Sequence, residues 1–175
     1  MVSLAKVGDF DVIADLNVEA YREFAGRMSL DGWRDMEASL RDVKGRAQTA
    51  RFLVMRDHGT IVGSVGYCPA GKGNPEIFSP DWAAVLLLAV SPTHRSRGIA
   101  RELVCACIQC ARDDAAQVIG LFTSELMTAA QQLYESLGFR RESELPPRRG
   151  LRYWRYKLPL AEPVISVCEM PNKSV

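Results

Sequence analysis

The chain has 175 residues, of which 47% are hydrophobic, and its 22 basic and 21 acidic residues leave a formal net charge of +1. This length allows one domain with a sizeable core, and the small net charge excludes a global field that would recruit nucleic acid or a membrane surface. The longest apolar run, residues 83–90, is too short to span a bilayer, and the first residues lack a signal pattern. We therefore expect a cytoplasmic protein, a monomer or homodimer, with no nucleic-acid or membrane partner.

Helical periodicity and strand-like runs alternate along the first half of the chain. Apolar residues at helical spacing predict a helix over residues 12–24 and a second one over residues 33–43. Residues 51–56 and 60–67 are rich in β-forming residues and are separated by an Asp-His-Gly turn, which predicts a hairpin. Residues 69–80 are rich in Gly and Pro and should form a loop.

The second half continues this alternation. Residues 83–90 are apolar at nearly every position, which is typical of a strand covered on both faces. A helix should follow Gly98, with Ile99, Leu103 and Cys107 on its buried stripe. The remaining predicted elements are a strand over 117–123, a helix over 128–137, and an antiparallel pair over 139–145 and 151–158 joined by a loop at 146–150. Residues 1–159 are therefore expected to form one mixed α/β domain, with a C-terminal tail over residues 160–175.

Three cysteines, Cys105, Cys107 and Cys110, lie close together on the helix predicted after Gly98. As a metal site they lack a fourth ligand and a nearby histidine. We interpret them as small apolar side chains and expect no metal.

The turn between the apolar strand and this helix is the most informative segment of the chain. It carries Arg95, Arg97 and Arg101 around a helix start, where the first four N–H groups have no partner within the helix. Gly98 lets a ligand approach the backbone because glycine has no Cβ. Such a helix start binds anions, above all phosphate, so the segment predicts a site for a phosphate-bearing cofactor.

Two motifs in this part of the chain resemble those of a known family. Residues 95–100 match the R/Q-x-x-G-x-G/A signature of the GNAT N-acetyltransferase superfamily, and residues 133–139 match its L-Y-x-x-x-G-F segment in the expected order. The resemblance covers roughly residues 52–158. It implies an α/β (α+β) fold with a mixed, mostly antiparallel central sheet flanked by helices, in which the fourth and fifth strands are splayed. It also implies acetyl-CoA as the cofactor.

The resemblance assigns the cofactor to defined segments. The backbone around Arg95 to Arg101 would cradle the pyrophosphate, and Leu88 to Val90 would pair with the pantetheine arm. Many relatives place an Asn seven residues before the motif tyrosine, whereas this chain has Met127 there, which leaves Ser124 or Thr128 to replace it. The full set is Leu88, Ala89, Val90, Arg95, Ser96, Arg97, Gly98, Ile99, Ala100, Arg101, Ser124 and Thr128.

The catalytic groups follow from the same resemblance. The backbone N–H near Val90 would hold the oxyanion, and Tyr134 would assist the leaving thiolate. A phenol with a pKa of about 10 is a weaker acid than a thiol at about 8.5, which favours a hydrogen bond over full proton transfer. Many relatives use a Glu on the fourth strand as the general base, but residues 83–90 contain no acid. The carboxylates nearest in sequence are Glu76, Asp81 and Glu125, each of which is equally a surface residue, and a water chain is an alternative.

The implied activity is acetyl-CoA-dependent transfer of an acetyl group directly to the primary amine of a small molecule or peptide, in a ternary complex. Two other hypotheses remain open: a non-catalytic acyl-CoA-binding or regulatory domain, and an unrelated nucleotide binder, which would need a Gly-rich phosphate loop that the sequence lacks. A basic loop over 148–152 would favour an acidic acceptor or simply be solvated. Aromatic residues that would either line the acceptor site or belong to the core are Tyr21, Phe24, Trp33, Tyr67, Trp82 and Trp154.

Overall fold

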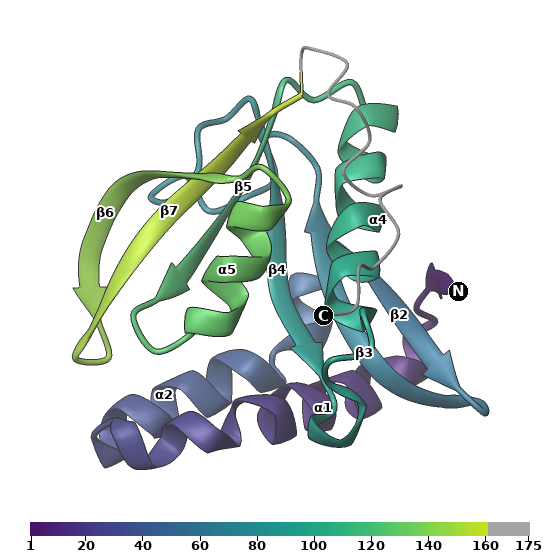
Figure 1. The fold of residues 1–175 in the computed structure, drawn as a ribbon, viewed down its shortest axis with the longest axis vertical. Helices are drawn as coiled ribbons and strands as arrows, with labels where there is room; N and C mark the ends of the chain where they lie inside the picture. The colour runs from purple at the N-terminus through teal and green to yellow at the C-terminus, as the bar shows by residue number, and fades with distance from the viewer. Residues whose placement is uncertain (161–175) are drawn as a thin grey trace.

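A seven-stranded sheet with helices on both faces makes up the protein, and the computed structural model describes residues 1–160 of it (Figure 1). The strands lie in the order β1-β2-β3-β4-β5-β7-β6. They are β1 (Val2–Leu4), β2 (Arg51–Asp57), β3 (Thr60–Cys68), β4 (Trp82–Val90), β5 (Val118–Ser124), β6 (Arg140–Arg148) and β7 (Leu151–Pro159). The α-helices are α1 (Phe10–Tyr21), α2 (Leu30–Arg41), α3 (Val43–Arg46), α4 (Ile99–Asp113) and α5 (Thr128–Ser136), with short 3-10 helices η1 (Val7–Asp9), η2 (Arg22–Arg27) and η3 (Pro92–His94).

The sheet is antiparallel except where β4 meets β5, so the predicted mixed, mostly antiparallel sheet flanked by helices is confirmed. The parallel pairing joins residues 82–84 to residues 118–120. Both strands continue beyond this short ladder, β4 to Val90 and β5 to Ser124. The last residues of β4 and β5 are therefore not paired with each other, as expected if the two strands splay apart toward their carboxyl ends.

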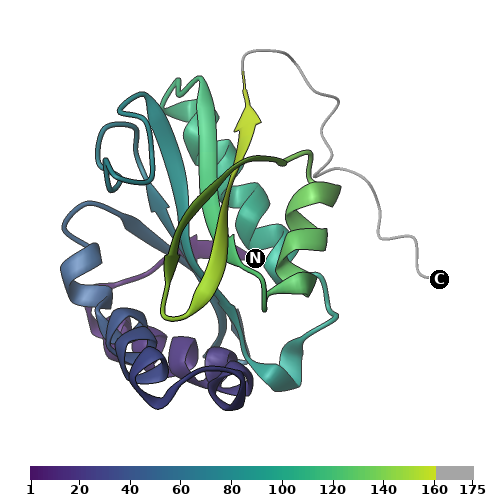
Figure 2. The same ribbon diagram turned by 90° about the vertical axis from the view of Figure 1, so that its left-hand side faces the viewer.

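The two faces of the sheet bury different helices, and strand β2 shows this by its alternation. Leu53 and Met55 point into the large core that contains the buried stripe of α4, whereas Phe52 and Val54 point into the cluster formed with α1. Successive side chains of a strand point to opposite faces. Helices α1 and α2 thus cover one face and α4 the other, as the two perpendicular views also indicate (Figures 1 and 2).

The N-terminal helices end earlier than the periodicity predicts. Helix α1 ends at Tyr21, and Phe24 lies in η2. Helix α2 ends at Arg41, and Val43 starts the separate helix α3. The cause of this second break is local, because the Asp42 carboxylate accepts a hydrogen bond from the Gly45 N–H at 3.1 Å and so caps a new helix.

The loop predicted at residues 146–150 is also shorter than expected. Pro146 and Pro147 belong to β6, which is an edge strand and so tolerates residues that cannot donate to a ladder. Only Arg149 and Gly150 form the turn, with φ of 56° and 73°. Two positive φ values are the backbone requirement of a tight type I′ hairpin.

The other predicted elements of the second half agree with the structure to within one residue at most boundaries. Strand β1 was not predicted, because a three-residue strand carries no periodicity. The predicted tail lies outside the described residues apart from Leu160. In residues 1–160, no helix is long and apolar enough to cross a membrane.

Candidate active site

A β-bulge distorts β4 where the strand leaves β5. The β3–β4 register passes from Ser64 opposite Ala89 to Gly66 opposite Leu86, so Val65 faces two residues of β4. One of these, Leu87, has a φ of 49°, a value that residues other than glycine rarely adopt. A bulge re-aims the backbone and side chains of its strand. Here it sets the direction of the last three residues, Leu88 to Val90.

The backbone beyond the bulge offers hydrogen-bonding groups to the gap between β4 and β5. The N–H of Ser91 donates to the carbonyl of Val62 on β3 at 2.9 Å. In an antiparallel pair, successive residues turn their N–H and C=O groups alternately toward the partner strand and away from it. Val90 therefore directs its N–H away from β3, toward the side where the ladder with β5 has ended.

The turn after β4 presents the start of α4 to the same region. Ser96 and Gly98 adopt φ of 60° and 80°, and α4 begins at Ile99. The first hydrogen bond across this start runs from the Glu102 N–H to the Gly98 carbonyl at 3.0 Å. A Cβ built on Gly98 would meet nothing within 4 Å. The space beside Gly98 at the first turn, where helical N–H groups have no partner within the helix, thus fits an anionic ligand such as a phosphate.

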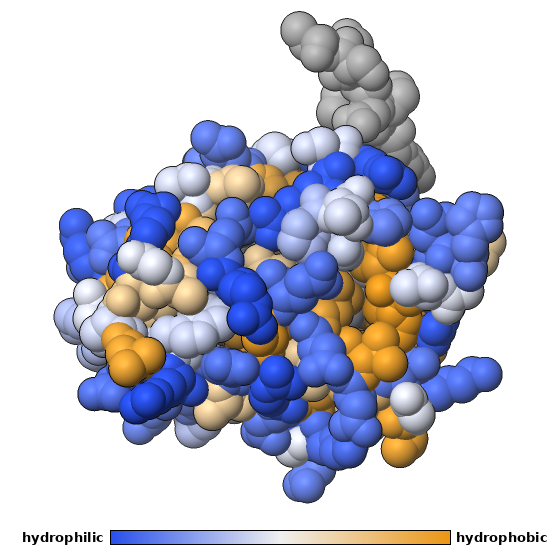
Figure 3. Space-filling model, turned by 90° about the horizontal axis from the view of Figure 1, so that it is seen from below, coloured by the Kyte–Doolittle hydropathy of each residue, from blue (hydrophilic) through white to orange (hydrophobic). Residues whose placement is uncertain are grey.

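These features border one cavity of about 990 Å³ between α1, β4 and the starts of α4 and α5. Its lining contains Arg27, Arg95 and Arg101 and one carboxylate, that of Glu23, so its charge favours an anion. The other lining residues are Ala20, Tyr21, Phe24, Leu88, Ala89, Val90, His94, Ser96, Gly98, Ile99, Ala100, Leu126, Met127, Thr128, Ala129, Ala130 and Leu133. From below the view of Figure 1, apolar groups are visible between hydrophilic ones (Figure 3).

The three arginines around the start of α4 differ in what they contact. Arg95 bonds the Ala20 carbonyl at 2.8 Å and the Glu23 carboxylate at 2.7 Å, and so ties the turn to the end of α1. Arg101 reaches Ser136 at 3.2 Å, and so ties α4 to α5. Arg97 donates only a long bond, 3.4 Å, to the Thr93 carbonyl and does not line the cavity.

Most of the residues that the sequence assigns to the cofactor lie together. Ten of the twelve line the cavity, and Arg97 and Ser124 do not. Ser124 is buried, and its hydroxyl has no hydrogen-bond partner among the described residues. Tyr21 is a further functional candidate, because its phenol donates a hydrogen bond to the Leu88 carbonyl at 3.1 Å. From the sequence alone it is only one of six aromatic candidates.

Tyr134 belongs to the large core and is not among the residues that line the cavity, whereas its neighbour Leu133 is. Tyr134 is 6% exposed and packs edge-on against Phe139. Burial raises the pKa of its phenol well above 10, and the nearby Tyr21 and Cys107 add to the rise. Tyr134 is therefore a neutral donor and a still weaker acid than an ordinary phenol.

The three carboxylates proposed from sequence are all exposed and line no cavity described here. Glu76 and Asp81 precede β4, at the end of the strand remote from Val90. Glu125 accepts the Arg152 N–H at 3.0 Å and so joins β5 to β7. The structure does not bring any of them to the bulge.

The aromatic candidates divide between the cavity and the core. Tyr21 and Phe24 line the cavity. Tyr67 and Trp82 are buried in the core, Trp33 packs on the α1–α2 cluster, and the Trp154 ring is covered by Arg141. In residues 1–160, no group of three or more His, Cys, Asp or Glu could hold a metal ion.

Comparison with known proteins agrees with this geometry. Residues 11–139 match the model of the acetyltransferase (GNAT) family. The chain belongs to this family. GNAT acetyltransferases use acetyl-CoA, and the cavity at the start of α4, with its open backbone at Gly98 and its arginines, fits the phosphates of that cofactor.

The relatives show how far the likeness extends. N-acetyltransferase 8 of Rattus norvegicus is 36% identical over 98 residues, which are 53% of this chain and 40% of the relative. N-acetyltransferase 8B of Homo sapiens is 32% identical over 93 residues, 53% of this chain and 40% of the relative. The chain thus spans about half or less of the length of these curated relatives.

Solved structures share the fold. An acetyltransferase from Salmonella typhimurium, determined with its cofactor acetyl-CoA, has a TM-score of 0.68 at 19% identity and covers 99% of this chain and 98% of its own. The PaiA N-acetyltransferase of Thermoplasma acidophilum, in complex with coenzyme A, has a TM-score of 0.67 at 14% identity over 89% of this chain and 98% of its own.

Proposed function

We propose that this protein is an acetyl-CoA-dependent N-acetyltransferase that transfers the acetyl group directly to a primary amine of a small molecule or peptide in a ternary complex. The observation that carries the proposal is the bulge at Leu87, which places the Val90 N–H in the gap beside the start of α4. Acetyl-CoA, when bound, supplies an activated acetyl group whose carbonyl oxygen gains negative charge as the amine attacks.

The chain supplies groups suited to hold the cofactor. The N–H groups at the start of α4 would donate hydrogen bonds to phosphate oxygens, and Arg95 and Arg101 add fixed positive charge. Residues 88–90 lie beyond the ladder with β5 and offer backbone groups to an extended arm, although the Leu88 carbonyl already accepts a hydrogen bond from Tyr21. The side chain of Thr128 lines the cavity at the start of α5 and offers a further hydroxyl.

Two donors serve the transfer itself. The Val90 N–H stabilises the oxyanion, an interaction whose loss typically costs about 3–4 kcal/mol in the transition state. Tyr134 donates a hydrogen bond to the departing sulfur rather than a whole proton, since its raised pKa disfavours ionisation. The amine loses its own proton to water, because Glu23, the carboxylate that lines the cavity, is paired with Arg95.

Direct transfer is favoured because Cys68, Cys107 and Cys110 are not activated as nucleophiles. Burial raises the pKa of the Cys68, Cys107 and Cys110 thiols, which keeps them protonated. A nucleophilic cysteine needs the opposite shift. An acetyl-enzyme intermediate on any of these three residues is therefore disfavoured.

The test is calorimetric titration with acetyl-CoA, CoA and ADP, followed by a screen of primary amines for thiol release. Micromolar binding of acetyl-CoA, far weaker binding of ADP and amine-dependent thiol release would support the proposal. Binding without turnover for any amine would leave an acyl-CoA-binding domain instead. No binding to either CoA form would refute both.

A further inference from the structure

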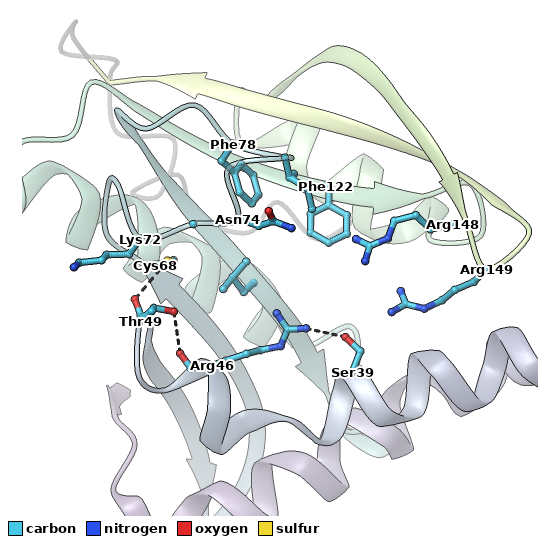
Figure 4. Close-up of a pocket in the computed structure, with 13 residues that line it drawn as sticks. Ser39, Arg46, Thr49, Cys68, Lys72, Asn74, Phe78, Phe122, Arg148 and Arg149 are labelled. Atoms are coloured by element: carbon cyan, nitrogen blue, oxygen red, sulfur yellow. Dashed lines mark hydrogen bonds between the residues drawn. The ribbon is translucent and has the colours of Figure 1, made fainter.

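A second, smaller cavity lies on the other side of the bulge in β4. It has a volume of about 250 Å³ and is bordered by α2, α3, the loop before β4, β5 and the turn between β6 and β7 (Figure 4). The two cavities share no lining residue, yet they approach each other at β4: Leu86 lines the small one, and Leu88 lines the large one. A molecule in the small cavity would therefore face the bulge from the side opposite the cofactor.

The small cavity carries an excess of positive charge. Its lining includes Arg46, Lys72, Arg148 and Arg149 and no carboxylate. Figure 4 shows the side chains of the three arginines pointing into the same space between α2 and the β6–β7 hairpin, while Lys72 points away. Arg149 forms an ion pair with Asp35 at 2.6 Å, and Asp35 is not a lining residue. The lining therefore offers no carboxylate to Arg46 and Arg148.

The Arg46 guanidinium would gain from binding an anion. Its Nη2 donates to the Ser39 hydroxyl at 2.7 Å, but its Nε is buried and has no hydrogen-bond partner among the described residues. Burial lowers the pKa of its guanidinium; Asp42 opposes this shift, and Arg149 and Arg148 reinforce it. A partly buried guanidinium with an unsatisfied Nε and no ion pair is costly, and a bound carboxylate or phosphate would remove much of that cost.

The rest of the lining combines the polar side chains of Ser39, Thr49 and Asn74 with an apolar part. Ile77 and Phe78 come from the loop before β4, Leu86 from β4 and Phe122 from β5. The ring centroids of Phe78 and Phe122 lie 6.2 Å apart with the rings tilted by 51° to each other, and together they form an apolar wall of the cavity. The cavity therefore combines a cationic side with an apolar side, and its size suits a single small group rather than a polymer backbone.

We propose that this cavity is the acceptor pocket and that it selects primary amines that carry an anionic group, a carboxylate or a phosphate, on a small apolar body. The inference rests on the proposed acetyl transfer and names its substrate class. Arg46 and Arg148 bind the anion, the Phe78–Phe122 wall holds the apolar part, and the amine is left facing the bulge at Leu87.

The test compares acceptors that differ only in the anionic group. Phenylalanine is paired with 2-phenylethylamine, and O-phosphoethanolamine with ethanolamine, so that the two pairs separate a carboxylate from a phosphate. The quantity measured is the ratio of kcat/KM within each pair, by thiol release with saturating acetyl-CoA. Because the amines differ in their own pKa, the decisive number is the change of this ratio between wild type and Arg46→Met.

In wild type, one pair should favour the anionic member, and Arg46→Met should reduce that preference about 10- to 100-fold, the range of a lost charge-assisted hydrogen bond. Arg46→Lys should restore part of it. Arg140→Gln is the matched control. Arg140 is exposed at the start of β6 and does not line the cavity, so this substitution removes one positive charge at a distant place. Equal ratios in wild type and Arg46→Met would overturn the proposal.

A binding measurement keeps the two proposals separable. N-acetylphenylalanine and N-acetyl-2-phenylethylamine are titrated into the full chain in the presence of CoA. If no amine is acetylated but the N-acetyl amino acid binds and Arg46→Met weakens it, the acetyl-transfer proposal fails and the anion selectivity stands. If amines are acetylated and the carboxylate and phosphate compounds show no advantage in turnover or binding, only the pocket proposal fails.

Discussion

The phenol of Tyr21 donates a hydrogen bond to the carbonyl oxygen of Leu88 at 3.1 Å, and so joins the end of α1 to the first residue of β4 beyond the bulge. Burial raises the pKa of Tyr21 to about 12, with a smaller contribution from Tyr153, so the phenol remains a donor at all physiological pH values. This bond helps fix the strand segment that borders the cofactor cavity.

Replacing two buried tyrosines should have opposite effects on stability. Tyr21→Phe removes a bond and leaves the Leu88 carbonyl unpaired, so we expect the free energy of unfolding to fall by about 1 kcal/mol. Tyr153→Phe removes a buried hydroxyl that has no partner among the described residues, so it should leave stability unchanged or raise it by up to about 1 kcal/mol. Urea unfolding of both variants measures this, and equal losses would contradict the assigned hydrogen bond.

The turn at Gly98 has room for a side chain, but a charged one there should abolish cofactor binding. Gly98→Glu brings a negative charge into open space before the first turn of α4, and we expect acetyl-CoA affinity to fall by about 100-fold or more. Gly59→Glu is the matched control, because Gly59 has a φ of 85° against 80° at Gly98, and a Cβ at either position meets nothing within 4 Å.

Both glutamate variants should lose similar stability, since each forces a side chain into the left-handed region. Only Gly98→Glu should lose cofactor binding by calorimetry. Unchanged affinity in that variant would show that the phosphates bind elsewhere.

Tyr134→Phe should separate turnover from binding. We expect kcat to fall about 100-fold with acetyl-CoA affinity within about twofold of wild type, since the hydroxyl acts on the departing sulfur and not on the phosphates. Tyr67→Phe serves as the control, because Tyr67 is also buried but its hydroxyl donates to Asp114, away from the cavity. An undiminished kcat in Tyr134→Phe would remove this residue from the reaction.

Stability should also decline at alkaline pH. Burial raises the pKa of Tyr21, Tyr67 and Tyr134 above the ordinary value of 10.0. As the pH rises, these tyrosines therefore ionise in the unfolded chain before they ionise in the folded protein. Their contribution to the free energy of unfolding is constant below about pH 10 and is lost as the pH rises above it. Unfolding in urea from about pH 8 to about pH 11 should show this decline, and Tyr134→Phe should make it shallower. An identical slope in wild type and the variant would contradict a raised pKa at Tyr134.

Local signals explain what the sequence could predict. The strand–turn–helix around Gly98 is continuous in the chain, and its glycine and arginines define the turn before any long-range contact is known. The bulge is different, because Leu87 is one leucine within the run Leu86 to Leu88 and no residue there indicates a positive φ. Its conformation comes from pairing with β3, which the sequence does not show.

Long-range packing explains what the sequence could not predict. Arg46 was assigned no role, because its position near Arg148 depends on α3 and the β6–β7 turn meeting in space. The basic segment at residues 148–152 was open to two interpretations, and only the structure shows that the Arg149 side chain is 11% exposed and bonded to Asp35. The carboxylates Glu76, Asp81 and Glu125 were chosen by distance along the chain, which says little about distance to the bulge.

The bond between Asp35 and Arg149 joins residues 114 positions apart, and the second of them lies beyond residues 11–139, the part of the chain that matches the family model. Two arginines of the small cavity, Arg148 and Arg149, thus come from a segment outside the shared part, whereas its other lining residues and Gly98 lie within it. If the small cavity is the acceptor pocket, as proposed, changes in the β6–β7 hairpin would alter the choice of acceptor and leave the cavity at the start of α4 intact. Exchange of this hairpin between relatives would then be a route to redesigning that choice.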